Sequence, residues 1–265
     1  MTKNVKFNVR KFSSGEYEVT IDGRIYGNQA VIHWNYFNEE EKDVYLLLLK
    51  INAVKTNYPN LPIIVDAPYL PYMRQDRIFN AGQGVPATFL VDTLHNAGVN
   101  KIRTYGCHSY QQNVDNWIMG NSNLLYQQSI IFPDANASKH YNLDNYPQFC
   151  FEKVRVNNEP KLVLKKDDTL LDELNLYSAH MIYDDIISGG RTFIECAKQI
   201  NEFTKQQSNI ELTVYNAFLD YGIENLKEAG IKRINIINKD SFDYVIKLYP
   251  NDTEYFNLIE FKHGE

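Results

Sequence analysis

The most informative stretch of the chain is Pro68-Tyr69-Leu70-Pro71-Tyr72-Met73-Arg74-Gln75-Asp76-Arg77, which follows the apolar run Ile63-Ile64-Val65. That run predicts a buried strand. Cations clustered at a strand end lose hydration and repel one another unless an anion binds between them. The guanidinium groups of Arg74 and Arg77 can each bind phosphate oxygens in a bidentate manner. The stretch therefore predicts a polyphosphate-binding site at the end of a buried strand.

Strand-like and helix-like patterns alternate along the rest of the chain. Runs of branched and aromatic residues predict strands at residues 16–21, 30–34, 63–65, 102–105, 129–132, 149–151, 179–183, 211–215 and 234–237. The turn signal Asp22-Gly23 favours a hairpin between the first two strands. The alternation is typical of βαβ units, so we predict an α/β fold with mainly parallel sheets. In such sheets ligands bind beyond the carboxyl ends of the strands.

Three helices are expected between these strands. Asn38 precedes three glutamates and resembles an N-cap with an acidic first turn. Pro86 suits the first position of a second helix, which ends before Gly98. The third helix follows residue 190. The apolar residues on one face of the first helix are Val44, Leu47, Leu48, Ile51 and Val54, and those of the third are Phe193, Ala197, Ile200 and Phe203.

Composition restricts the class of protein. The 265 residues suit about two domains, and 44% hydrophobic with 23% charged residues is typical of a globular protein. A net charge of −6 argues against nucleic-acid binding, which needs a basic face. The scattered Cys107, Cys150 and Cys196 indicate neither a disulfide framework nor a zinc site. The first residues lack the apolar region of a signal peptide and no apolar run could span a bilayer, so we expect a cytoplasmic protein without membrane contact.

A second informative stretch is Asp184-Asp185-Ile186-Ile187-Ser188-Gly189-Gly190-Arg191-Thr192, at the predicted end of the strand 179–183. The Gly-Gly pair lets the backbone approach a ligand closely. Ser188, Thr192 and the N-terminus of the following helix offer donors to a phosphate. The structural alternative is a helix cap beside a solvated acidic pair.

Both stretches resemble motifs of the ribose-phosphate pyrophosphokinases (PRPP synthetases). The first resembles their ATP-binding signature, Pro-Tyr-x-x-Tyr-x-Arg-Gln-Asp-Arg, and the second their ribose-phosphate loop, Asp-Asp-x-x-Asp-Thr-x-Gly-Thr. The resemblance runs from Phe12 to about Asn238 and is that of a short, divergent member. It implies two tandem type I phosphoribosyltransferase-like domains, the first binding ATP and the second ribose phosphate, with the active site between them. The pattern of strands and helices places the boundary near residue 127, which gives domains of residues 1–127 and 128–265.

The resemblance also implies roles in the first domain. Phe12-Ser13-Ser14-Gly15-Glu16 resembles a family hairpin that reaches the ATP site of a neighbouring subunit, so we expect a homodimer or a larger homo-oligomer. His108 would act in catalysis and contact the metal, whereas His33 and His95 are expected to be structural. The residues that would bind ATP are Phe12, Glu16, Arg74, Gln75, Asp76 and Arg77.

In the second domain, Glu152-Lys153-Val154-Arg155 resembles the start of the family's catalytic arm. Lys153 and Arg155 would therefore stabilise charge that develops during phosphoryl transfer. Pro133-Asp134 resembles a segment whose Asp lies near the metal, which implies Mg²⁺ held by His108 and Asp134. Asp184 and Asp185 would hold the ribose hydroxyls. The residues that would hold the 5-phosphate are Ser188, Gly189, Gly190, Arg191 and Thr192.

The activity that the resemblance implies is diphosphoryl transfer from Mg-ATP to the 1-hydroxyl of ribose 5-phosphate, which gives PRPP and AMP. Ser188 replaces an Asp and Arg191 a Gly of the family loop, and both changes make it more positive. An acceptor with a second phosphate, ADP-ribose, is therefore an alternative with the same chemistry and a role in NAD salvage. A phosphoribosyltransferase is less consistent with the ATP motif, and a non-catalytic regulatory subunit is less consistent with the retained His108, Lys153 and Arg155.

Overall fold

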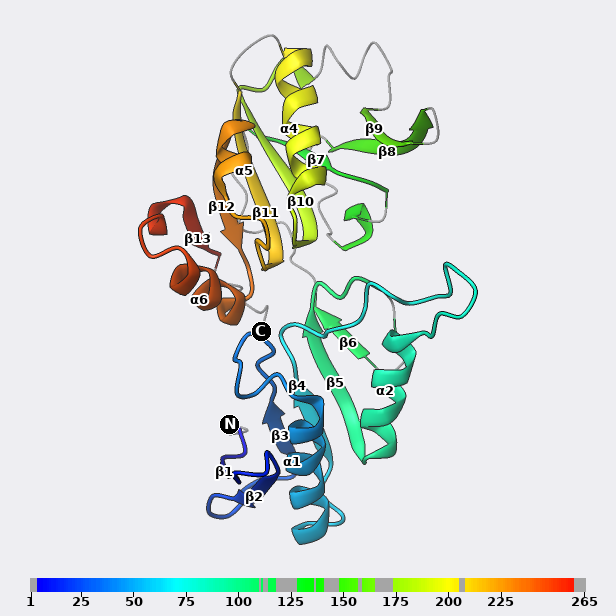
Figure 1. Ribbon diagram of the computed structural model, residues 1–265, viewed down its shortest axis with the longest axis vertical. Helices are drawn as coiled ribbons and strands as arrows, with labels where there is room; N and C mark the ends of the chain where they lie inside the picture. The colour runs from blue at the N-terminus through cyan, green and yellow to red at the C-terminus, as the bar shows by residue number, and fades with distance from the viewer. Residues whose placement is uncertain are drawn as a thin grey trace. The chain divides into compact units, whose positions relative to one another are not determined.

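The computed structural model describes residues 4–109, 111, 114–117, 128–135, 137–140, 148–156, 159–164, 174–204 and 208–259. The chain divides into two compact units, Met1–Trp117 and Ile118–Glu265, each with its own hydrophobic core (Figure 1). We predicted the boundary at residue 127. Residues 118–127 lie outside the described part of the chain, and that boundary stays a prediction.

The N-terminal unit contains a parallel sheet whose described strands are ordered β3-β4-β5-β6. Its strands are β3 (Ala30–His33), β4 (Ile63–Asp66), β5 (Val99–Tyr105) and β6 (Val114–Trp117). Helix α1 (Val44–Asn57) connects β3 to β4, and helix α2 (Pro86–Asn96) connects β4 to β5. The buried helix residues Leu47, Ile51 and Leu94 pack into the same core as Ile63 and Ile102. These βαβ units bring the carboxyl ends of the strands to one edge of the sheet.

The predicted pairing of the strand at residues 16–21 with the strand at residues 30–34 is wrong. Strand β2 (Tyr17–Ile21) pairs antiparallel with β1 (Phe7–Lys11) and not with β3. The turn at residues 12–16 closes this hairpin, because Phe12 N–H donates to the Glu16 carbonyl over 2.8 Å and Gly15 takes φ 92°. Strand β3 is buried and lies beside β4 instead. The short turn in residues 12–16 closes more readily than the longer connection through Asp22-Gly23.

The predicted start of the first helix is also wrong. Helix α1 begins at Val44, and the Asp43 side chain caps it by accepting the N–H of Tyr45 over 2.8 Å. The Asn38 side chain instead accepts the N–H of Glu40 in a local turn. Both side chains can form such a bond, and the one next to the apolar stripe begins the helix. The start of α2 at Pro86 is confirmed.

The C-terminal unit contains a sheet whose described strands are ordered β13-β12-β11-β10-β7-β8-β9. These strands are β7 (Gln128–Phe132), β8 (Gln148–Val156), β9 (Glu159–Leu164), β10 (Ala179–Ile187), β11 (Asn209–Ala217), β12 (Ile231–Ile236) and β13 (Phe256–Leu258). All described pairings in it are parallel except β8 with β9. The mainly parallel α/β prediction is therefore confirmed.

Helices α4 (Arg191–Thr204), α5 (Glu224–Glu228) and α6 (Lys239–Leu248) connect β10, β11, β12 and β13 in turn (Figure 1). The strands advance in one direction across the sheet, so right-handed crossovers place these helices on one face. Short 3-10 helices lie at η2 (Ala137–His140) and η3 (Thr253–Tyr255). Phe193, Leu226 and Val245, one residue from each α-helix, share one core with the strands.

Two predicted strand ends lie further along the chain than expected. Strand β10 continues to Ile187 because Ile186 and Ile187 pair with Asn216 and Ala217 of β11, so the Asp184-Asp185 pair lies inside the strand. Strand β8 likewise continues to Val156 because β9, which we did not predict, pairs with it. The residues 152–155 therefore lie within a strand and not beyond one.

Candidate functional site

The Arg-Gln-Asp-Arg stretch leaves the N-terminal sheet at the carboxyl end of β4. The N–H of Ala67 donates to the Arg103 carbonyl over 2.9 Å, and the N–H of Tyr105 donates to the Pro68 carbonyl over 3.2 Å. These bonds fix the start of the stretch against β5. Leu70 and Met73 are buried in the core, whereas Arg74 and Arg77 are exposed. The buried anchors thus hold a backbone that presents two guanidinium groups to solvent.

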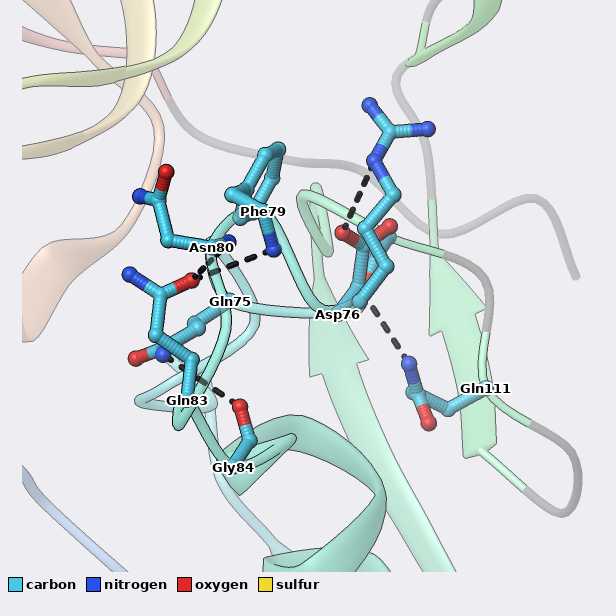
Figure 2. Close-up of polar contacts among 9 residues, drawn as sticks. Gln75, Asp76, Phe79, Asn80, Gln83, Gly84 and Gln111 are labelled. Atoms are coloured by element: carbon cyan, nitrogen blue, oxygen red, sulfur yellow. Dashed lines mark hydrogen bonds and ion pairs between the residues drawn. The ribbon is translucent and has the colours of Figure 1, made fainter.

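The side chains of two glutamines form hydrogen bonds that close the loop that follows (Figure 2). The Gln83 Oε1 accepts the N–H groups of Phe79 over 3.1 Å and Asn80 over 3.0 Å. The Gln75 Nε2 donates to the Gly84 carbonyl over 3.3 Å. The predicted ATP ligand Gln75 therefore shapes the loop through its amide, and Gln83 is a loop residue that the sequence reasoning missed.

Arg77 has two neighbours within this loop. Its Nε lies 3.9 Å from the Asp76 Oδ1, and its guanidinium carbon lies 5.2 Å from the Phe79 ring centroid. Both contacts are solvent-exposed and weak, so a polyphosphate could replace them. The adjacent Tyr72 takes φ 69°, a left-handed conformation that is uncommon for a residue with a side chain.

His108 lies just past β5, at the same sheet edge as the arginine stretch, and is exposed. The preceding Cys107 fixes this segment, because its N–H donates to Asn116 Oδ1 over 2.8 Å. The other two histidines of this unit have local partners. His33 Nδ1 lies 3.7 Å from Asp66 Oδ2, and His95 Nδ1 lies 2.8 Å from the Val99 carbonyl. His108 is thus placed where a ligand at this edge could meet it.

The β1-β2 hairpin exposes the two remaining predicted ATP residues. Phe12 is 39% exposed, and the Arg10 guanidinium carbon lies 4.8 Å from its ring centroid. The Glu16 Oε2 accepts the Ser14 hydroxyl over 2.8 Å. The aromatic ring and the carboxylate therefore lie on one exposed turn.

In the C-terminal unit, two adjacent carboxylates lie near the end of β10. Asp185 is buried, Asp184 is half-buried, and the Asp185 N–H donates to Asp184 Oδ1 over 2.9 Å. Burial raises the pKa of Asp184 well above its ordinary value, and the charges of Asp185 and Asp134 raise that pKa further. A site that concentrates negative charge in this way suits hydroxyl donors or a cation.

The loop after β10 begins with Ser188, whose hydroxyl donates to Asp220 Oδ2 over 2.6 Å. The N–H of Asp220 donates back to the Ser188 carbonyl over 3.1 Å. We expected Ser188 to donate to a phosphate, but its hydroxyl donates to Asp220 instead. Asp220 itself was missed, because 32 residues separate it from Ser188 and no local pattern links them.

The two glycines of this loop differ in their surroundings. A Cβ on Gly189 would lie 2.7 Å from the Tyr221 ring, so Tyr221 packs directly on the loop. Gly190 takes φ 72°, which favours glycine. Arg191 and Thr192 then begin α4, and the N–H of Ile194 donates to the Gly190 carbonyl over 3.0 Å. The first N–H groups of this helix are oriented as an anion site requires.

Comparisons with known proteins agree with the fold. Residues 1–98 match the N-terminal domain of ribose phosphate pyrophosphokinase. The chain is 24% identical to a ribose-phosphate pyrophosphokinase of Sulfolobus acidocaldarius, with 98% of this chain and 90% of the relative covered. It is 29% identical to ribose-phosphate pyrophosphokinase 3 of Saccharomyces cerevisiae, with 77% and 67% covered. The chain is therefore similar to ribose-phosphate pyrophosphokinases over nearly its whole length.

The fold of this protein also matches a solved structure. The phosphoribosylpyrophosphate synthetase of Mycobacterium smegmatis superposes with a TM-score of 0.69 over 97% of this chain and 86% of that chain, at 18% identity. This similarity establishes the two-domain phosphoribosyltransferase-like fold. Within the described residues, no helix is long and apolar enough to cross a membrane.

The predicted catalytic pair, Lys153 and Arg155, lies on β8 opposite Leu162 and Pro160 of β9. Their side chains are outside the described part of the structure, so their roles stay predictions. The predicted metal residues belong to different units, His108 to the first and Asp134 to the second. Asp134 accepts the Ala137 N–H over 3.1 Å through its Oδ1.

The residues of the C-terminal site fit Mg²⁺. Among the described residues, no three His, Cys, Asp or Glu side chains are arranged as a metal cage. Mg²⁺ does not require one, because it usually keeps waters and binds one or two carboxylates together with substrate phosphates. The mutual repulsion that acts on Asp184 is the electrostatic condition that a cation would relieve.

Proposed function

We propose that this protein is a ribose-phosphate pyrophosphokinase, which transfers the β,γ-diphosphoryl group of ATP to the 1-hydroxyl of ribose 5-phosphate, giving PRPP and AMP. One observation carries the proposal. Each unit has a loop suited to anion binding at a carboxyl end of its parallel sheet, an arginine loop after β4 and a Gly-Gly loop after β10. A polyphosphate donor and a phosphorylated acceptor need one such loop each.

In the reaction, the 1-oxygen of the ribose attacks the β-phosphorus of ATP. The bond between that phosphorus and the α,β-bridging oxygen breaks, AMP leaves with the bond electrons, and the hydroxyl proton passes to solvent. Exposed Arg74 and Arg77 would bind the polyphosphate and neutralise its charge. Catalysis of this kind depends on positioning and on stabilisation of developing charge.

The acceptor would be held at three places in the C-terminal unit. Asp184 and Asp185 would accept hydrogen bonds from the ribose hydroxyls. The backbone N–H groups of residues 189–192, with the Thr192 hydroxyl and the exposed Arg191, would bind the 5-phosphate. Ser188 would not donate to that phosphate, because its hydroxyl donates to Asp220.

Mg²⁺ would neutralise the polyphosphate and orient it for attack. We assign Asp134 and His108 to the metal, with Asp134 the stronger ligand because Mg²⁺ prefers oxygen. His108 would also take part in catalysis. Lys153 and Arg155 would stabilise the charge that develops between the transferred group and AMP. These four assignments rest on the family motifs.

Two further proposals concern the setting of the enzyme. Phe12 and Glu16 would contact the ATP of a neighbouring subunit, so the active protein would be a homodimer or a larger homo-oligomer. The exposed ring and carboxylate on the β1-β2 turn support this role. We place the enzyme in the cytoplasm, where its substrate ATP is available.

Ribose 5-phosphate is preferred over ADP-ribose as the acceptor. The argument for ADP-ribose was that the loop lacks the family Asp at position 188 and is therefore more positive. The Asp220 carboxylate, 2.6 Å from the Ser188 hydroxyl, restores a negative charge at that place. The remaining difference, Arg191, is exposed and can be screened by water.

The test is to incubate the protein with Mg-ATP and ribose 5-phosphate, and to separate AMP from ADP by chromatography. We expect AMP and PRPP in equal amounts, and no AMP after removal of Mg²⁺ with a chelator. Asp185→Asn is the matched inactive variant. Formation of ADP, or no product, would contradict the proposal. AMP formed with ADP-ribose but not with ribose 5-phosphate would keep the chemistry and replace the acceptor.

A further inference from the structure

Two loops that are far apart in the sequence bind each other at the acceptor site. The first is the Gly-Gly loop after β10, and the second is the loop 218–223 between β11 and α5. Three hydrogen bonds join them. The N–H of Phe218 donates to the Ile187 carbonyl over 2.9 Å, the N–H of Asp220 donates to the Ser188 carbonyl over 3.1 Å, and the Ser188 hydroxyl donates to Asp220 Oδ2 over 2.6 Å.

The second loop is itself firmly held. Leu219 is buried and takes the left-handed φ of 58°, which is uncommon for leucine. Its carbonyl accepts the Tyr249 hydroxyl of the segment after α6 over 3.0 Å and the Gly222 N–H over 2.9 Å. Such a backbone persists only when its surroundings determine it. The backbone that carries Asp220 is therefore held in one conformation beside the Gly-Gly loop.

We propose that Asp220 is a positioning residue of the acceptor site, and this inference rests on the proposed function. By accepting the Ser188 hydroxyl, Asp220 holds the backbone of residues 188–190 in place. The N–H groups at residues 190–192 would then face the acceptor phosphate, and the loop would not have to become ordered when the phosphate binds. Asp220 acts through Ser188 and does not itself contact the reacting atoms.

The geometry explains why a serine suffices where the family uses an aspartate. A serine hydroxyl has one proton, and a carboxylate accepts it in a charge-assisted bond, which is stronger than a bond between neutral groups. Because the proton faces Asp220, Ser188 cannot bind the phosphate directly. Its contribution is the shape of the loop, which preorganises the site and lowers the entropy lost on binding.

The test is a double-mutant cycle read by acceptor binding. Ser188→Ala, Asp220→Ala and the double variant are prepared in the full chain. The Kd of ribose 5-phosphate is measured by calorimetry with Mg²⁺ and α,β-methylene-ATP, whose bridging carbon blocks transfer. We expect each single variant to weaken binding about tenfold, which is the lower range for a hydrogen bond to a charged group. The double variant should bind no more than about twofold weaker than either single variant, because each single variant already loses the same Ser188–Asp220 hydrogen bond.

Two variants separate positioning from other effects. Asp220→Asn keeps an oxygen that accepts the Ser188 hydroxyl, so its Kd should stay within about threefold of the parent. Tyr249→Phe removes a bond to the same loop without touching Ser188, and should lower the melting temperature while leaving the Kd within about twofold. The Kd of α,β-methylene-ATP should not change in any variant.

Several results would overturn the inference. They are additive losses in the double variant, a loss in Asp220→Asn equal to that in Asp220→Ala, unchanged binding in Asp220→Ala, or equal weakening of nucleotide binding. A parent protein that binds no ribose 5-phosphate would also overturn it. A parent that binds ribose 5-phosphate but forms no AMP would contradict the proposed function alone, because the binding cycle would still decide the role of Asp220.

Discussion

Asp184 is proposed to bind the ribose, and its carboxylate charge destabilises the folded state. The charges of Asp185 and Asp134, together with burial, disfavour the ionised form of Asp184 and raise its pKa. The folded state therefore holds a proton on Asp184 more strongly than the unfolded state does. Stability that depends on this proton is present at low pH and is lost as the pH rises through the raised pKa. Such strain is common at functional sites.

Asp184→Asn tests this balance. Asparagine keeps the oxygen that accepts the Asp185 N–H but removes the repelled charge. We expect the melting temperature at pH 8 to rise by about 2–4 °C, the shift that roughly 1 kcal/mol produces in a protein of this size. The kcat/KM for ribose 5-phosphate should fall at least about tenfold, because a ribose partner is altered.

Asp243→Asn is the matched control for this change. Asp243 is an exposed carboxylate on α6 that pairs with Lys239 over 2.9 Å. A surface pair of this kind contributes little to stability. Its loss should leave the melting temperature and kcat/KM near those of the parent. A lower melting temperature in Asp184→Asn would contradict the electrostatic explanation.

His180 provides a separate pH dependence. It lies buried on β10, its Nδ1 is 2.7 Å from the Ser129 hydroxyl, and its Nε2 has no hydrogen-bond partner among the described residues. Burial lowers the pKa of His180 to about 4. Since its unfolded pKa is near 6.5, the unfolded state binds the extra proton between pH 6.5 and 4. Stability is therefore complete above pH 6.5 and is lost as the pH falls through this window.

The measurement is the free energy of unfolding by urea at several pH values between 7.5 and 4.5. The parent should lose up to about 3 kcal/mol from this residue across the window, at roughly 1.4 kcal/mol per pH unit. His180→Gln removes the titrating ring and should reduce the pH slope, whatever its effect at pH 7.5. Equal slopes in parent and variant would show that His180 is not responsible.

At the scale of elements, the β1-β2 hairpin depends on one glycine. Gly15 takes φ 92°, and a Cβ placed there meets no described atom within 4 Å. An alanine at this position would therefore be strained by its backbone alone. A left-handed conformation costs roughly 1–2 kcal/mol for an ordinary residue. The strain should disorder the turn that carries Phe12 and Glu16.

Gly15→Ala should raise the KM for ATP about fivefold to tenfold and leave the Kd of ribose 5-phosphate unchanged. Gly15→Asn is the conservative comparison, because asparagine tolerates left-handed φ better than alanine. It should show a smaller increase in the KM for ATP. Unchanged steady-state kinetics in Gly15→Ala would remove the hairpin from the ATP site.

For the whole molecule, the proposed use of a neighbour's hairpin predicts a homo-oligomer. Sedimentation velocity at assay concentrations should show a dimer or a larger species. Phe12→Ala should raise the KM for ATP about tenfold, because a stacked ring contributes on the order of 1–3 kcal/mol per base. Phe89→Ala is the matched control, since Phe89 is an exposed ring on α2 outside the predicted site. A fully active monomer would contradict this prediction.

The pattern of apolar and polar residues along the chain was sufficient to predict the α/β class and most strands. Apolar runs such as residues 63–65 and 129–132 form buried parallel strands, because both of their faces are covered. The Arg-Gln-Asp-Arg and Asp-Asp stretches were found because their chemistry is contained in consecutive residues. Local signals also identified the start of α2 at Pro86.

The tertiary structure decided the features that depend on residues far apart in the sequence. The partner of β2, the length of β10 and the pairing of β8 with β9 follow from neighbouring strands, which a local pattern does not contain. Asp43 and Asn38 could each cap a helix, and packing of the apolar stripe selected Asp43. Asp220 joins Ser188 across 32 residues only because β10 and β11 pair in parallel and bring their ends together.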